Sequence, residues 1–172
     1  MFRAKTDVAR RAGAAETQLV EWLAHWSVDA LRISLGLVFL AFGVLKFFPG
    51  LSPAQSLAGR TVEILTLGLV PESLAVIAVA ALETAIGVLL ITGWWLRLGI
   101  ALLLFAMAGI LSPLALLPGE MFRAPLAPTL EGQYVIKDVV LLAAALVIGA
   151  RALGARMVPA ERGRVAAAGR AS

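Results

Sequence analysis

Residues 74–92 read LAVIAVAALETAIGVLLIT, and this stretch decides the fold. Its only charged residue is Glu83. A helix of this length spans about 28 Å at 1.5 Å per residue, close to the roughly 30 Å hydrocarbon core of a bilayer. A helix on the surface of a soluble domain would instead show a polar face. The stretch therefore predicts a transmembrane helix.

Three further stretches of the chain have the same character, at about residues 29–48, 96–117 and 134–150. The last of them is short for a membrane span unless its helix begins a few residues before Tyr134. Of the 172 residues, 60% are hydrophobic and only 15% are charged, which is more apolar than a soluble domain. We therefore expect an all-α fold in which residues 29–150 form a membrane-embedded four-helix bundle.

The segments that flank this bundle are polar, at residues 1–28 and 151–172. In the first, Leu19, Trp22, Leu23 and Trp26 recur at helical spacing, which predicts a short N-terminal amphipathic helix. Such a helix either lies on the membrane surface with its tryptophans at headgroup level or packs on a neighbouring element. The second segment is basic and rich in small residues, and we expect it to be a disordered tail.

The loop after the first span contains a sequence that predicts the N-terminus of a helix. Ser52-Pro53-Ala54-Gln55 has the pattern of a capping box, with Ser52 as the N-cap. We expect a short interfacial helix from there to about Leu67. The other loop on this side, residues 118–133, carries three prolines and is expected to be extended.

The distribution of basic residues predicts the orientation in the membrane. The two loops just described hold one each, Arg60 and Arg123. The opposite side holds Arg3, Lys5, Arg10, Arg11, Arg97, Arg151, Arg156, Arg162, Arg164 and Arg170. Because cytoplasmic segments carry the excess of Lys and Arg, both the N- and the C-terminus are expected to be cytoplasmic. The loops at residues 49–73 and 118–133 are then on the outer side.

Several kinds of chemistry are excluded by residue types. The chain has no cysteine and one histidine, His25, so it offers neither thiolate ligands nor a pair of axial haem ligands. Its glycines lie inside apolar helices rather than between a strand and a helix, which argues against a nucleotide-binding loop. We predict no metal site, no cofactor of its own and no nucleic-acid partner.

The candidate site is a group of charged residues in the outer half of the bundle. Glu83 lies about 14 Å into its helix, where a carboxylate must be paired or protonated. Lys46 ends the first span, Lys137 and Asp138 open the fourth, and Tyr134 lies one turn before Asp138. We expect these five residues to converge. The alternatives are that the lysines reach for the headgroups, that Asp138 only complements a helix N-terminus, or that Glu83 forms a purely structural ion pair.

One face of the first span carries a regular stripe. Its members are spaced by four and three residues: Arg32, Gly36, Phe39, Gly43 and Lys46. Gly36 and Gly43 would allow close helix approach, and Gly87, one turn after Glu83, would do so on the second span. Asp29 and Arg32 are expected to form an ion pair at the cytoplasmic interface, and Arg97 to fix the orientation.

Three segments carry a resemblance to a known family. They run from Arg32 to Gly36 and on to Lys46, from Leu82-Glu83 to Gly93, and from Glu131 to Asp138. Together they resemble the DoxX family of small four-helix membrane proteins over about residues 29–150. The chain most resembles bacterial members, which implies a location in a bacterial cytoplasmic membrane.

The family takes its name from subunits of a thiosulfate:quinone oxidoreductase, although most members have no established activity. The resemblance implies an auxiliary or anchoring subunit of a membrane redox or stress-response complex. Its partners would be the lipid bilayer, a membrane or peripheral redox enzyme, or further copies of the chain. One alternative is a carrier or binding protein for a quinone, a lipid or a small anion, with Lys46 and Lys137 facing the ligand. Another is a quinone-linked oxidoreductase in its own right, for which the chain offers no obvious electron carrier.

Overall fold

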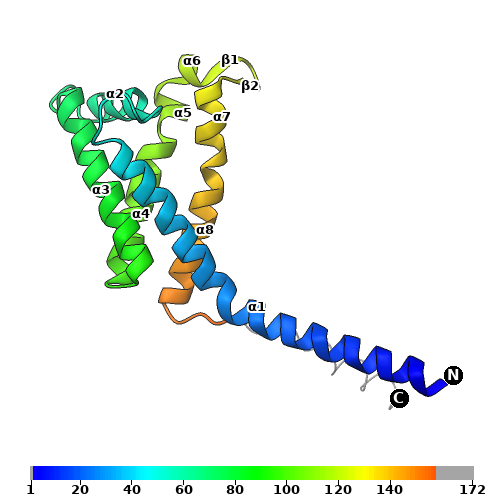
Figure 1. Ribbon diagram of the computed structural model, residues 1–172. Helices are drawn as coiled ribbons and strands as arrows, with labels where there is room; N and C mark the ends of the chain where they lie inside the picture. The colour runs from blue at the N-terminus through cyan, green and yellow to red at the C-terminus, as the bar shows by residue number, and fades with distance from the viewer. Residues whose placement is uncertain (1, 158–172) are drawn as a thin grey trace, which may run out of the picture.

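The computed structural model describes residues 2–157 and is almost entirely helical (Figure 1). In chain order the elements are α1 (Phe2–Leu45), α2 (Gln55–Leu65), α3 (Glu72–Thr92), α4 (Leu96–Leu111), α5 (Pro113–Leu116), α6 (Pro118–Met121), β1 (Phe122–Ala124), β2 (Ala127–Pro128), α7 (Leu130–Lys137) and α8 (Val139–Ala152). The predicted all-α class is confirmed, with one small antiparallel hairpin, β1–β2, as the exception. The predicted tail beyond Met157 lies outside the described residues.

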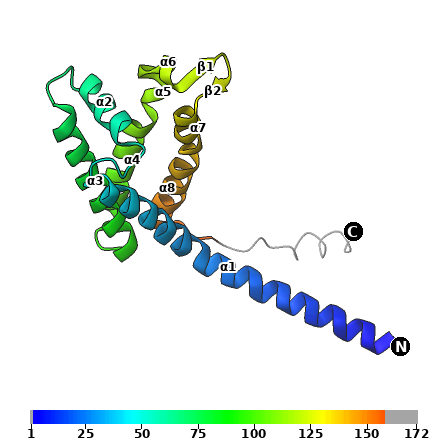
Figure 2. The same ribbon diagram turned by 45° about the horizontal axis from the view of Figure 1, so that its top comes forward.

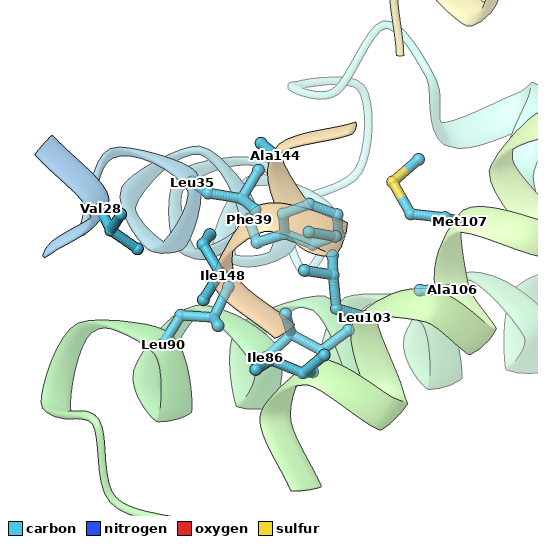
Figure 3. Packing of buried hydrophobic residues seen from close by; sticks show 12 residues of the cluster. Val28, Leu35, Phe39, Ile86, Leu90, Leu103, Ala106, Met107, Ala144 and Ile148 are labelled. Atoms are coloured by element: carbon cyan, nitrogen blue, oxygen red, sulfur yellow. The ribbon is translucent and has the colours of Figure 1, made fainter. Parts of the chain in front are cut away.

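One apolar core holds four of the helices together. Helix α3 packs between α1 and α4, while α8 contacts both α1 and α4. The buried residues of this core come from all four helices (Figure 3): Val28, Leu35, Phe39, Ile86, Leu90, Ile100, Leu103, Ala106, Met107, Ala144, Ala145 and Ile148. Many large apolar side chains point away from it, such as Phe105 at 71% exposure and Val140 at 70%. Outward apolar side chains of this kind are expected where lipid is the solvent.

Three helical stretches are long and apolar enough to cross a membrane. They are Ala15–Leu45, Glu72–Thr92 and Leu96–Leu116, the last of which joins α4 and α5. The predicted fourth span is divided at Asp138 into α7 and α8. Neither piece alone is long enough to span a membrane. The membrane-type fold is therefore recognised from the three long apolar helices.

The first helix is longer than predicted. The structure joins the expected amphipathic segment and the first span in one helix, α1, which also ends three residues earlier than predicted, at Leu45. No proline or glycine lies between Gly13 and Gly36, so nothing in the sequence breaks the helix there. Its N-terminal part extends away from the other helices (Figures 1 and 2).

The predicted capping box at Ser52 is wrong. Helix α2 begins two residues later than that N-cap implies, with Ala54 as its N-cap, and the buried Ser52 Oγ has no hydrogen-bond partner among the described residues. The Gln55 side chain serves another purpose. Its Oε1 accepts a hydrogen bond from the Gly50 N–H at 3.0 Å, which closes the turn between α1 and α2.

The loop at residues 118–133 is not extended, contrary to the prediction. It folds into α6, the β1–β2 hairpin and the start of α7 (Figure 1). Thr129 then caps α7, because its Oγ1 accepts from the Gly132 N–H at 3.1 Å and donates to the Glu120 carbonyl at 2.6 Å. The helix therefore starts at Leu130, four residues before the predicted start at Tyr134.

Candidate functional site

A buried ion pair connects α1 to α3. Lys46 follows the last residue of α1, and Glu83 lies in the middle of α3. The Lys46 Nζ donates to Glu83 Oε2 at 2.6 Å, and the two side chains are 4% and 7% exposed. A charge-assisted hydrogen bond of this length is among the strong ones. The two charges therefore neutralise each other in the interior of the bundle.

Glycines let the two helices approach closely enough for this pair to form. A Cβ atom added to Gly43 would lie 2.6 Å from the Thr84 backbone nitrogen, and one added to Gly87 would lie 2.5 Å from the Leu40 nitrogen. A Cβ atom added to Gly36 would likewise lie 3.0 Å from the Leu90 Cβ. These distances leave no room for a side chain. The backbones of α1 and α3 are in direct contact at Gly43 and Gly87, and the α3 side chains of Leu90 and Ile91 fill the space at Gly36.

Asp138 is the third charged group near this pair. It lies at the junction of α7 and α8, is partly buried, and is close enough to Glu83 and Lys46 for their charges to act on its carboxyl group. The structure thus places the Asp138 carboxyl group within electrostatic range of the Lys46–Glu83 pair. We call Lys46, Glu83 and Asp138 the polar cluster.

Lys137 and Tyr134 lie elsewhere. The Lys137 Nζ is 5.6 Å from the centroid of the Tyr134 ring, and both residues are exposed. This is the geometry of a cation–π contact at a surface. The structure therefore separates the five residues of the predicted site into the polar cluster and an outward Tyr134–Lys137 pair. A helix turns 100° per residue, which directs Lys137 and Asp138 to different sides.

Arg32 has a partner that sequence reasoning missed. Its Nη1 donates to the carbonyl oxygens of Leu90 and Ile91, the latter at 3.1 Å, at the C-terminal end of α3. Gly93 ends that helix with a left-handed φ of 71°, and a Cβ there would lie 3.2 Å from the same guanidinium nitrogen. The predicted contact with Asp29 is present at 3.4 Å. Arg32 thus satisfies carbonyl groups that a helix end leaves unpaired.

An open hollow adjoins the polar cluster on the side of α2. It is lined by Lys46, Phe47, Pro49, Gln55, Glu72, Ser73, Val76 and Ile77. The Gln55 Nε2 donates to the Lys46 carbonyl oxygen at 3.4 Å, so this side chain connects the wall of the hollow to the end of α1. Next to Glu83, the Thr84 Oγ1 is buried without a hydrogen-bond partner in the described part of the chain. No sequence pattern singled out Gln55 or Thr84 as part of this region.

The donor types do not favour a metal. Within residues 2–157, no group of three or more His, Asp or Glu side chains is placed to hold a metal ion. His25 is exposed and packs edge-on against Trp26, with 5.1 Å between the ring centroids. What the polar cluster offers chemically is a paired cation and an additional carboxyl group for hydrogen bonds or proton exchange.

The fold and this site together define an all-α integral membrane protein in which a buried ion pair joins two of its long helices. The sequence profile of the DoxX family matches residues 27–116, which is more than half of the chain, and the protein belongs to the DoxX family. Lys46 and Glu83 lie inside the matched region, whereas Asp138 lies outside it. Comparison with curated proteins and with solved structures gave no match.

Proposed function

We propose that this DoxX protein is an auxiliary or anchoring subunit of a redox or stress-response complex in a bacterial cytoplasmic membrane. The observation that carries the proposal is the Lys46–Glu83 pair. Its two charges satisfy each other at 2.6 Å, so they hold α1 on α3 and leave the ammonium group committed. A site built for turnover would instead hold its polar groups ready for a substrate. The chemistry of the complex then belongs to a partner.

In this proposal the chain crosses the membrane four times. Helices α7 and α8 together run from Leu130 to Ala152, about 34 Å at 1.5 Å per residue, which is long enough for the fourth crossing. Both termini are then cytoplasmic, in line with the excess of basic residues on that side. Since the chain has no cysteine, single cysteines at Gly119 and Ala155 test this with an impermeant thiol reagent in intact cells. We expect labelling at position 119 alone.

The docking surface would be the outer cap, which we define as α2, α5, α6 and the β1–β2 hairpin. An ion pair between Arg60 Nη2 and Glu120 Oε1, at 2.7 Å, connects α2 to α6 across it. Leu126 in the β1–β2 turn is 97% exposed, and Leu67, just after α2, is 90% exposed. Exposed apolar side chains of this kind could contact a protein partner.

Native mass spectrometry of the protein gently extracted from its own membrane tests the proposal. We expect a stoichiometric partner that carries a redox cofactor. Leu126→Glu in the outer cap should release this partner without changing the melting temperature. Phe105→Leu, on the exposed face of α4, is the matched control and should keep it. A protein that emerges without any partner would contradict the subunit role.

The hollow beside Lys46 supports a second candidate, a carrier or binding protein for a quinone, a lipid or a small anion. Gln55, Glu72 and Ser73 line it without taking part in the ion pair. A small molecule that copurifies and is lost in Gln55→Leu, a variant that leaves the Lys46–Glu83 pair intact, would favour this function. The third candidate, a quinone-linked oxidoreductase acting alone, requires quinone turnover by the isolated protein.

A further inference from the structure

We propose that Arg151 and Arg156 form a binding site for the phosphate of an anionic phospholipid, at the end of the bundle opposite the outer cap. This is where the α3–α4 turn and the end of α8 lie (Figure 1). The inference concerns a lipid site of the chain itself and is independent of the partner proposed above.

The site is a second open hollow, between α1 and the segment that follows α8. From α1 it is lined by Glu21, Ala24 and His25, and from the other side by Arg151, Gly154, Ala155, Arg156 and Met157. Gly154 has a left-handed φ of 103°, which turns the chain back toward α1 after the end of α8 (Figure 1). The Ser27 Oγ then meets the Met157 Sδ at 4.0 Å. The fold itself therefore brings the two arginines to the side of α1.

The charges in this hollow favour an anion. Among the described residues the ion pairs are Asp29–Arg32, Lys46–Glu83 and Arg60–Glu120, so neither Arg151 nor Arg156 has an acidic partner within bonding distance. Glu21 lines the same hollow, which leaves two guanidinium groups against one carboxylate. Guanidinium groups bind phosphate oxygens through paired hydrogen bonds.

An apolar stripe beside the hollow points to a lipid rather than to a free phosphate. On α1, Leu19, Trp22, Leu23 and Trp26 are 55%, 59%, 44% and 52% exposed, on turns that also carry Glu21 and His25. Trp94 and Trp95, in the α3–α4 turn at the same end of the bundle, are 71% and 67% exposed. Tryptophans of this kind lie at the level of the lipid headgroups. A ligand with an anionic head and acyl chains would contact both the arginines and the stripe.

Native mass spectrometry in detergent, with added phosphatidylglycerol or phosphatidylcholine, tests the site. We expect phosphatidylglycerol to bind more tightly, and Arg151→Gln/Arg156→Gln to weaken it about 30-fold, since each basic residue near an anionic surface contributes roughly fivefold. Arg97→Gln is the matched control, because this exposed arginine lies at the same end of the bundle but outside the hollow. It should change the affinity little.

Glu21→Gln provides an independent check, because removing the carboxylate from the hollow should tighten phosphatidylglycerol binding. Equal affinity for the two lipids, or an equal loss in Arg97→Gln and in the double variant, would overturn the proposal. Millimolar inorganic phosphate should not displace the lipid. If it does, the arginines bind a soluble anion and the assignment to a phospholipid is wrong.

Discussion

Lys46 and Glu83 are 37 residues apart in the chain, and their side chains meet at 2.6 Å in the interior of the bundle. Both are almost fully buried, so water cannot compensate either charge if the other is removed. The pair closes the contact between α1 and α3 at the end of α1. Substitutions that break this ion pair should therefore destabilise the contact between α1 and α3 more than other substitutions in it.

Replacing Glu83 by Gln should strongly destabilise the protein. The buried Lys46 ammonium would lose its counter-charge, and breaking a buried pair in this way costs about 3–5 kcal/mol. Thermal unfolding in detergent should show a clear fall in the melting temperature. An unchanged melting temperature would contradict the pairing.

Two further variants test whether the loss of stability comes from leaving a buried charge unpaired. Lys46→Met/Glu83→Leu removes both charges together and should recover most of the lost stability, because buried ion pairs are often replaceable by apolar groups. Glu120→Gln breaks the half-exposed pair with Arg60 and should cost only about 0–1 kcal/mol.

Replacing Gly87 by Ala should force α1 and α3 apart. The new methyl group would lie 2.5 Å from the backbone nitrogen of Leu40, which cannot move aside as a side chain can. We expect a loss of about 1–3 kcal/mol in the free energy of unfolding, as for other overpacked sites. Gly109→Ala on α4 is the control, because nothing lies within 4 Å of its added methyl group. It should stabilise the protein by about 0.5–1 kcal/mol.

Replacing Arg32 by Met should loosen the C-terminal end of α3. The carbonyl groups of Leu90 and Ile91 would lose a charged donor, at a cost of about 1.5–3 kcal/mol. Hydrogen exchange should increase in the last turn of α3 and in the α3–α4 turn, while the β1–β2 hairpin stays unchanged. Equal exchange in the variant and the parent protein would show that Arg32 does not hold this helix end.

Replacing Thr129 by Val should weaken the start of α7. The hydroxyl that accepts from the Gly132 N–H and donates to the Glu120 carbonyl would be lost at nearly constant volume. The expected cost is about 0.5–2 kcal/mol, measured by unfolding in detergent. Thr129→Ser keeps the hydroxyl and should behave like the parent protein. Similar losses in both variants would mean that the methyl group matters rather than the cap.

The sequence was sufficient to predict the class of fold and much of the helix content. Long apolar stretches determine membrane helices with little ambiguity, and the predicted end of the second span at residue 92 agrees with the end of α3 at Thr92. The errors lie where local patterns compete. Ser52 has the form of an N-cap, but the Gln55 side chain is needed at Gly50, and α2 starts later. The prolines of residues 118–133 indicated an extended loop, yet the segment folds as the short helix α6, a hairpin and the start of α7.

For the candidate site, the sequence indicated which residues are polar but not which of them meet. Lys137 and Asp138 are neighbours in the chain, and only the rotation of the helix decides that Asp138 lies within electrostatic range of Glu83 while Lys137 contacts Tyr134. The hydrogen bonds from Arg32 to Leu90 and Ile91 could not be predicted for a similar reason. They join a side chain of α1 to backbone carbonyl groups of α3, and every residue has such a carbonyl group, so the sequence does not indicate which one accepts.

The contact of α1 with both α3 and α8 has a consequence for how the protein is made. Because α1 is synthesised first, Lys46 enters the membrane before Glu83, which carries its counter-charge, has been synthesised. Glu83 arrives with the next long helix, and the two can already form a compact hairpin through their glycine contacts. Helix α8 is synthesised last and completes the core between α1 and α4. A chain cut before α8 would thus insert with α1, α3 and α4 in place and the Lys46–Glu83 charges paired, but with one side of its core left open to lipid.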